Sequence, residues 1–176
     1  MNQPLDMSGR TVVVTGASAG IGRDTAVLLS QLGARVVLVG RNVERLNATA
    51  AQLAGAGHVV EAFDLSKLDE IPGWLKRLVE KVGELHGVVH CAGVQQTMPL
   101  RAATVGAAED LMRVNVLAAL MLAKGLRQKG VRAADASLVL VASVMGLVGA
   151  PGRAVYCASK GAIIRSEERR VGKECA

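Results

Sequence analysis

The sequence predicts an α/β protein built on a doubly wound parallel sheet, in three α/β/α layers, and three observations point to this class. Short aliphatic runs rich in valine alternate along the chain with stretches whose apolar residues keep helical spacing. Although 51% of the residues are hydrophobic, the only aromatic residues are Phe63, Trp74 and Tyr156. Aliphatic side chains must therefore fill the core, as they do in parallel sheets covered by helices. A glycine-rich turn at residues 15–22 joins the first such run to the first helical stretch.

This glycine-rich turn follows residues 11–14, predicted as a buried strand, and precedes residues 23–32, predicted as a helix. Gly16 can take backbone angles that a Cβ atom forbids, and Gly20 and Gly22 let a pyrophosphate and the first strand approach the helix closely. The free N–H groups and the positive dipole end of the helix then face the anion. The turn therefore predicts a dinucleotide site, with a purely structural glycine turn as the alternative.

The next two predicted strands end at side chains that suit an adenosine. Residues 34–39 form the second strand, and Arg41 follows it where an acidic residue would favour NAD. Arg41 can instead pair with a 2′-phosphate, so NADP is favoured; a solvated surface arginine is the alternative. Residues 57–63 form the third strand and lead into Asp64 and Leu65. The Asp64 carboxylate can accept a hydrogen bond from an adenine amino group or cap the next helix.

Two helices and a fourth strand come next. Asn42 is expected to cap a helix over residues 43–53, and Pro72 to open an amphipathic helix. Residues 87–90 predict the fourth strand, which ends at the sequence Cys-Ala-Gly of residues 91–93. Small residues at this turn would let a nicotinamide ribose lie against the backbone.

The second half of the chain places two polar residues next to predicted elements. Residues 107–129 predict one long helix rich in Ala and Leu, and Asn115 within it is expected to be buried and hydrogen-bonded. Residues 137–142 are almost continuously apolar and predict a fifth strand with a central position in the sheet. Such a strand delivers Ser143 to its carboxyl edge.

Tyr156 and Lys160 stand four positions apart at the start of a further helix and therefore share one of its faces. A phenol is a poor base at neutral pH, but a nearby ammonium and the positive nicotinamide of an oxidised cofactor favour the phenolate. Lys160 can also hold the nicotinamide ribose, and Ser143 can donate to a substrate oxygen on which negative charge develops. This set predicts acid–base chemistry coupled to hydride transfer.

Composition argues against several other classes. The cysteines form neither a disulfide framework nor a metal-ligand spacing, which fits a reducing compartment; they are Cys91, Cys157 and Cys175. His86 and His90 flank a predicted strand, so no metal site is expected. The net charge of +6 is spread along the chain without a basic stripe, which argues against a nucleic-acid partner. No apolar run is long enough to span a bilayer and the N-terminus has no apolar targeting core, so a cytoplasmic protein without a membrane partner is expected.

The motifs occur in an order that resembles the short-chain dehydrogenase/reductase family over residues 9–164. The matching residues are Thr15 to Gly22, Asp64, residues 91–93, Asn115, Ser143, Tyr156 and Lys160. The resemblance implies a Rossmann fold and an oxidoreductase that transfers a hydride between NADP(H), with NAD as the alternative, and a small-molecule carbonyl or alcohol. It also implies a homo-oligomer for the full-length parent. Within the family, the pattern looks most like the 3-oxoacyl-carrier-protein reductase and related carbonyl reductase branch.

The resemblance also assigns roles to individual residues. The implied catalytic set is Asn115, Ser143, Tyr156 and Lys160, with Tyr156 as the acid/base and Asn115 serving a proton relay. The implied cofactor-binding set is Gly16, Ser18, Ala19, Gly20, Ile21, Gly22, Arg41, Asp64, Leu65, Cys91, Ala92, Gly93, Tyr156 and Lys160. Cys91 stands where the family usually has asparagine, so the side-chain hydrogen bond that braces this turn is not expected, whereas the backbone contacts are.

The chain is expected to divide into residues 1–164, an incomplete NAD(P)-binding domain, and residues 165–176, a non-native tail. Seven of the eleven residues from Arg165 to Cys175 are charged, and this stretch resembles translated sequencing-adapter DNA. The fold would then lack its last strands and the lid of the substrate pocket. We therefore expect this chain to be inactive or barely active although its parent is an enzyme; the alternative is a non-catalytic NAD(P)-binding protein or redox sensor.

Overall fold

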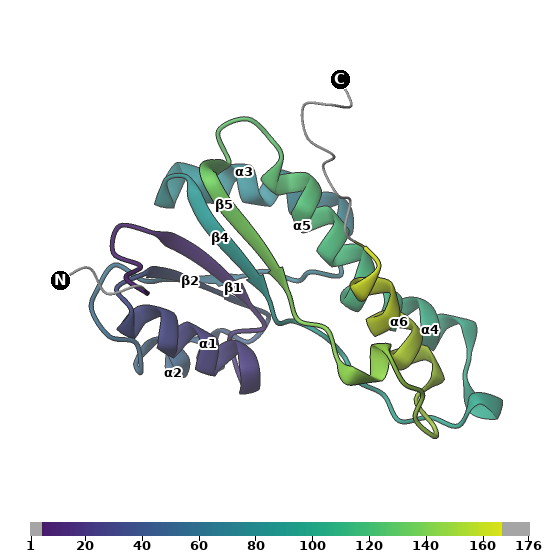
Figure 1. Cartoon of the computed structure of the whole chain (residues 1–176). Coiled ribbons are helices and arrows are strands. Elements are labelled where there is room, and N and C mark those ends of the chain that lie inside the picture. Colours follow the sequence, from purple (N-terminus) through teal and green to yellow (C-terminus); the bar gives the residue numbers. More distant parts are fainter. Residues whose placement is uncertain (1–4, 167–176) are drawn as a thin grey trace.

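Five parallel strands form one sheet in the order β3-β2-β1-β4-β5, as seen in Figure 1, a computed structural model that describes residues 5–166. The strands are β1 (Thr11–Thr15), β2 (Arg35–Gly40), β3 (Val59–Ala62), β4 (Leu85–His90) and β5 (Arg132–Leu140). The helices are α1 (Gly20–Gln31), α2 (Val43–Ala50), α3 (Ile71–Val82), α4 (Val105–Met112), α5 (Ala118–Leu126) and α6 (Ala154–Ile164). The predicted α/β class and parallel sheet are confirmed. Most of the predicted tail, residues 167–176, lies outside the described residues.

Helices cover both faces of the sheet, and each face has its own core. On one face, valines of β1 and β2 pack against α1 and α2, as shown by the buried residues Val12, Val14, Ala26, Val36, Leu38 and Leu46. On the other face, the alternate residues of the same strands pack against α3 and α5; the buried members include Val13, Val37, Trp74, Leu75, Leu78 and Leu122. Successive side chains of a strand point to opposite faces, so residues 12–14 of β1 and 36–39 of β2 must be apolar at every position.

β5 differs from its prediction in two respects. It begins at Arg132 rather than at residue 137, because Arg132 pairs with Leu85 ahead of an irregularity in the register. Its predicted central position is wrong for the described sheet, since β4 is the only strand with which β5 pairs between residues 5 and 166. Val139 is consequently 50% exposed. An apolar sequence indicates side chains suited to burial, but it does not supply the neighbour that buries them.

The predicted helix over residues 107–129 is one helical region interrupted by a π-turn. α4 leads into a π-helical segment, η3 (Arg113–Leu117), which continues into α5. A π-turn inserts an extra residue into the helical hydrogen-bond ladder and commonly occurs at functional sites. Asn115 lies at the centre of this segment.

Helix boundaries follow local chemistry. The Asn42 side chain accepts a hydrogen bond from the Arg45 backbone N–H at 2.8 Å, which confirms the predicted cap of α2. α2 is shorter than predicted and ends at Ala50. Pro72 lies in the first turn of α3, as expected for a residue without an N–H donor. No helix in residues 5–166 is long and apolar enough to cross a membrane.

Candidate active site

A cavity of about 320 Å³ lies where β1 to β4 end, and most of the predicted cofactor residues line it. Its walls are Gly16, Ser18, Ala19, Gly40, Arg41, Phe63, Asp64, Leu65, Ser66, Cys91, Ala92, Gly93, Val94 and Val114. Crevices at the carboxyl ends of parallel strands are the usual ligand sites of such sheets. The structure therefore brings together nine predicted cofactor residues that the sequence spreads over four strand ends.

Five predicted cofactor residues do not line this cavity: Gly20, Ile21 and Gly22 of α1, and Tyr156 and Lys160 of α6. Gly20 begins α1 with a positive φ of 52°, and the Ile21 side chain is 64% exposed. A Cβ atom on Gly22 would overlap the backbone carbonyl of Gly16. Gly22 is therefore needed so that α1 can pass close to the turn that precedes it.

Gly16 ties the glycine-rich turn to the end of β4. Its φ is +67°, and a Cβ atom at this position would lie 2.8 Å from both Cα and N of Ala92. The Thr15 hydroxyl oxygen accepts a hydrogen bond from the Ala92 N–H at 3.2 Å. This bond braces the turn at Cys91, where the sequence departs from the family's asparagine. Thr15 was absent from the predicted site residues; its place directly before Gly16 is the signal that could have included it.

The N-terminus of α1 adjoins the cavity through Ser18 and Ala19, and the N-cap side chain accepts no hydrogen bond from the first N–H groups of the helix. The N-cap residue Ala19 has no side chain that could accept them, and the first turn contains no acidic residue. Free N–H groups and the helix dipole together favour an anion at this position. The local sequence thus fits a pyrophosphate.

Arg41 and Asp64 lie on the wall formed by the ends of β2 and β3. Asp64 Oδ1 accepts a hydrogen bond from the Ser66 N–H at 2.9 Å, which is the capping role considered as its alternative. That bond, aided by the charges of Arg41 and Lys67, holds the pKa of Asp64 below its usual value. Asp64 is therefore an ionised acceptor beside a cation.

Lys160 connects α6 to this cavity. Its Nζ donates to the Val141 carbonyl at 2.7 Å and lies 6.0 Å from the centroid of the Tyr156 ring. A Cβ atom on Gly93 would stand 3.8 Å from the same Nζ, so the ammonium adjoins the cavity wall. Burial lowers the pKa of Lys160. Lys160 thus lies between this cavity and Tyr156, although Lys160 and Tyr156 do not themselves line the cavity.

Ser143 lies just after β5, as predicted, and its hydroxyl oxygen accepts from the Met145 N–H at 3.2 Å. This bond caps a short helical turn, η4 (Val144–Gly146), that packs directly on α6. A Cβ atom on Gly146 would meet the Lys160 carbonyl oxygen at 2.7 Å. The close approach fixes the Ser143 turn against the helix that carries Tyr156 and Lys160.

Asn115 is buried and joins three segments. Its Oδ1 accepts from the Val94 N–H at 2.8 Å, and its Nδ2 donates to the Val94 carbonyl at 2.9 Å. The same Nδ2 donates to the Ser159 hydroxyl of α6 at 3.1 Å. With its side chain occupied in this way, Asn115 holds the π-turn, the loop after β4 and α6 in one arrangement.

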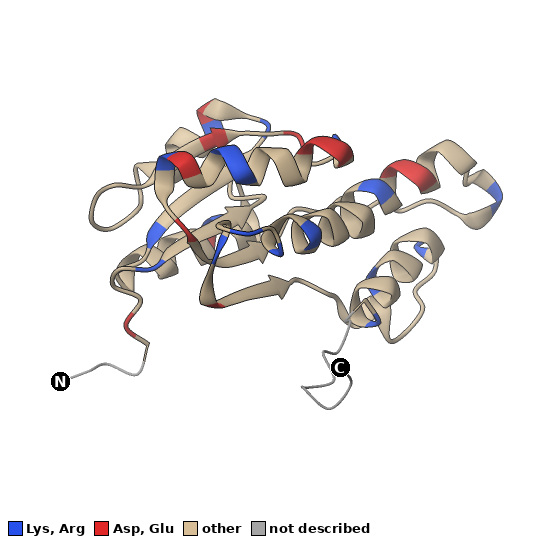
Figure 2. Ribbon diagram, turned by 90° about the horizontal axis from the view of Figure 1, so that it is seen from above, with Lys and Arg blue, Asp and Glu red and all other residues tan. Residues whose placement is uncertain are grey.

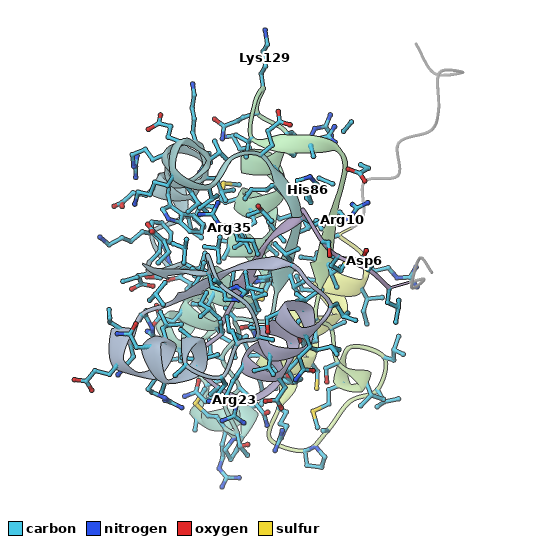
Figure 3. The ribbon with its side chains drawn as sticks, turned by 90° about the vertical axis from the view of Figure 1, so that its left-hand side faces the viewer. Asp6, Arg10, Arg23, Arg35, His86 and Lys129 are labelled. Carbon is cyan, nitrogen blue, oxygen red and sulfur yellow. The ribbon has the colours of Figure 1, made fainter. Side chains whose placement is uncertain are left out.

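His90 is a buried group whose environment the sequence did not reveal. Its Nδ1 lies 2.9 Å from the Thr15 hydroxyl, whereas Nε2 is buried and has no hydrogen-bond partner among residues 5–166. Burial, together with the nearby charge of Lys160, lowers the pKa of His90 to about 4. His86 lies at the other end of β4, where its Nδ1 accepts from the Thr11 N–H. Figure 3 shows His86 beside Arg10, far from Arg23 at the start of α1.

We expect acid to destabilise the fold through His90. The folded-state pKa of about 4 lies below the ordinary 6.5, so the unfolded chain binds a proton first as the pH falls. This group therefore lowers the free energy of unfolding between pH 6.5 and 4, by roughly 2–4 kcal/mol in all, and has no such effect above pH 6.5. Urea unfolding across this range should be less steeply pH-dependent in His90→Asn than in the parent. Equal slopes would contradict the prediction.

The first strand of this parallel sheet leads into a helix through a glycine-rich turn, and a cavity lies at the carboxyl edge of the sheet. These features together define the dinucleotide-binding α/β class. The family model described as short chain dehydrogenase matches residues 10–168. The chain belongs to the short-chain dehydrogenase family.

Relatives and solved structures agree with this assignment. The chain is 29% identical to a 3-oxoacyl-[acyl-carrier-protein] reductase of Bos taurus, over 95% of this chain and 70% of the relative. It is 35% identical to an oxidoreductase of Staphylococcus epidermidis, over 88% of this chain and 66% of the relative. A short chain dehydrogenase structure from Escherichia coli, complexed with NADPH, has a TM-score of 0.84 at 31% identity, covering 93% and 71% of the two chains. The structure of a short chain dehydrogenase from Shigella flexneri has a TM-score of 0.85 at 30% identity, and the match covers 94% of this chain and 68% of that chain. The chain spans 64–70% of the length of these and similar curated relatives.

Proposed function

We propose that the protein transfers a hydride between NADP(H) and a carbonyl or alcohol substrate, with Tyr156 as the acid/base. The observation that carries this proposal is the convergence of the glycine-rich turn, Arg41, Asp64 and the turn at residues 91–93 on one cavity that Lys160 adjoins. Relatives support the cofactor, since two similar structures are described as complexed with NADPH and NADP.

The residues around the cavity fit such a dinucleotide. The N–H groups at the start of α1 would hold its pyrophosphate, and Arg41 and Asp64 would hold the adenosine end. The absence of a Cβ at Gly93 leaves the backbone open beside Lys160, where a ribose hydroxyl would lie. When bound, the nicotinamide supplies or accepts the hydride.

The proton chemistry belongs to the chain itself. Tyr156 Oη would donate a proton to the oxygen of a carbonyl as that oxygen gains negative charge, or accept one from an alcohol. The Lys160 ammonium, 6.0 Å from the ring, favours the phenolate that remains. The Ser143 hydroxyl would donate to the same substrate oxygen. Asn115 would position the loop and α6, and serve the relay that returns a proton to Tyr156.

Arg41 should select the phosphorylated cofactor. A charge-assisted hydrogen bond to a 2′-phosphate is lost in Arg41→Ala, so we expect its dissociation constant for NADPH to rise about 10- to 100-fold. Binding of NADH, which has no phosphate there, should change little. Equilibrium titration measures the dissociation constants of both cofactors. The matched control is Arg45→Ala, since Arg45 is an exposed arginine on α2. A similar loss for both cofactors would count against a phosphate contact.

The test of the function is NADPH-dependent reduction of a panel of carbonyl compounds, on this chain and on a form extended to its relatives' length. We expect turnover by the extended form and little or none by the 176 residues alone. In the part of the chain that the structure describes, the outer edge of β5 is unpaired, and Leu147 and Val148 beside the Ser143 turn are exposed. Tight NADPH binding without turnover in either form would instead favour a non-catalytic binder or redox sensor.

A further inference from the structure

Arg153 lies close to the proposed catalytic residues but has no role in the proposed proton chemistry. It is the residue directly before α6, three positions before Tyr156 and seven before Lys160. This spacing places the three residues on one side of the helix. Arg153 is half-buried, and Nη1 contacts the Met145 sulfur at 3.9 Å, on the turn that follows Ser143.

A second loop holds the guanidinium from the other side. With its oxygen toward Arg153, the Gln95 side chain accepts a hydrogen bond from Nη2 at 3.1 Å. Gln95 follows the cavity residues Gly93 and Val94. The two loops also meet through the backbone, since the Met98 N–H donates to the Gly152 carbonyl at 2.6 Å. Arg153 is thus fixed where the loop after β4 meets the loop after β5, next to the helix face of Tyr156.

No carboxylate neutralises this guanidinium within residues 5–166. Residues 85–108 and 136–166, which include both loops and α6, contain no Asp or Glu, and their Lys and Arg residues are Arg101, Arg153, Lys160 and Arg165. In Figure 2, α6 shows basic and no acidic positions. A half-buried cation without a counter-ion is well suited to bind an anion.

The same loops expose aliphatic side chains. Leu100 on the first loop is 71% exposed and Leu147 on the second is 74% exposed. Val94, Val144 and Val148 are also exposed. Exposed apolar groups gathered around a polar anchor are typical of a surface that binds an apolar ligand.

We infer that the substrate is an aliphatic carbonyl compound that carries an anionic group, carboxylate or phosphate, and that Arg153 binds this anion while the two loops contact the aliphatic part. The inference rests on the proposed function and narrows its substrate class. It assigns Arg153 to substrate specificity, separate from the proton chemistry of Tyr156.

The kinetic test compares aliphatic 3-oxo acids with their methyl esters, and with a 3-oxoacyl thioester that carries phosphate, in the form that turns over. The enzyme without substitutions should prefer the anionic substrates to the methyl esters. Whether it prefers the 3-oxo acid or the phosphate-bearing thioester shows whether the bound anion is a carboxylate or a phosphate. Arg153→Gln should lower kcat/KM for that substrate about 10- to 100-fold and leave the ester unchanged. Arg153→Lys should retain part of the preference, and Arg101→Gln is the matched control. A residue that only braced the loops would affect acid and ester alike, so an unchanged acid-to-ester ratio would overturn the inference.

A binding measurement separates this inference from the proposed function. Saturation-transfer NMR with decanoate, and separately with decyl phosphate, requires neither cofactor nor turnover. We expect saturation to pass to one or both ligands from the unsubstituted chain and from Arg101→Gln, but not from Arg153→Gln. This result, with no NADPH-dependent reduction by either the 176-residue chain or the extended form, would support the anion site while rejecting the oxidoreductase function. Equal transfer to the ligand from the unsubstituted chain and from Arg153→Gln, or none from the unsubstituted chain, would reject the anion site.

Discussion

Replacing Tyr156 by Phe should lower kcat by about 100- to 10,000-fold, because the change removes the hydroxyl proposed to exchange a proton with the substrate. The aromatic ring, and with it the packing of α6, is retained. NADPH affinity should change little, since the groups proposed to hold the cofactor are Lys160, Arg41 and the glycine-rich turn. Steady-state kinetics and equilibrium NADPH titration on the same preparations measure the two effects.

The adjacent Cys157 supplies the control for Tyr156. It is a half-buried free cysteine on α6 without a proposed role, so Cys157→Ser tests whether a small change in this helix affects turnover. We expect near-parental kcat for Cys157→Ser. Full activity in Tyr156→Phe would remove Tyr156 from the mechanism, and loss of NADPH binding in that variant would indicate a structural role instead.

Replacing Gly16 by Ala should both destabilise the fold and weaken cofactor binding. The new Cβ would occupy a backbone position with φ of +67° and lie 2.8 Å from backbone atoms of Ala92. The left-handed backbone and the steric overlap together should lower the free energy of unfolding by roughly 2–4 kcal/mol. Relief of the overlap must separate the glycine-rich turn from the end of β4, so NADPH affinity should fall at least about tenfold.

Gly83 provides a matched control for this variant. Its φ is +77°, but an added Cβ would meet no heavy atom within 4 Å, and it lies after α3, away from the cavity. Gly83→Ala should therefore cost only the backbone strain, about 1–3 kcal/mol, and leave NADPH binding unchanged. Urea unfolding and NADPH titration of both variants test the comparison. Equal destabilisation by the two substitutions would show that the contact with Ala92 has little energetic weight.

Local sequence patterns were sufficient for the strand-to-helix order and for most of the cavity. The valine runs of β1 and β2 are apolar at every position because helices cover both faces of these strands. The residues that directly follow strands, among them Gly16, Arg41 and Asp64, could be assigned to one site since parallel strands bring their carboxyl ends to the same edge.

Features that depend on contacts between distant segments could not be predicted from the sequence. The start of β5 contains charged residues and does not have the sequence pattern of a strand. Arg132 belongs to β5 only because it pairs with Leu85 of β4. The sequence also does not reveal that the Asn115 side-chain amide forms hydrogen bonds with Val94 and Ser159, or that the Thr15 hydroxyl accepts a hydrogen bond from the Ala92 N–H. The place of Arg153 between Gln95 and Met145 arises from two loops that are separated by a helical region and β5.

The central claim is that a dinucleotide bound in the crevice presents its nicotinamide to Tyr156. A crystal structure of the chain with NADPH tests it most directly. We expect the pyrophosphate at the N-terminus of α1, the adenosine between Arg41 and Asp64, and the nicotinamide ribose at Lys160, with the ring beside the Tyr156 hydroxyl. A nicotinamide ring directed away from α6, with Tyr156 remote from it, would contradict the account.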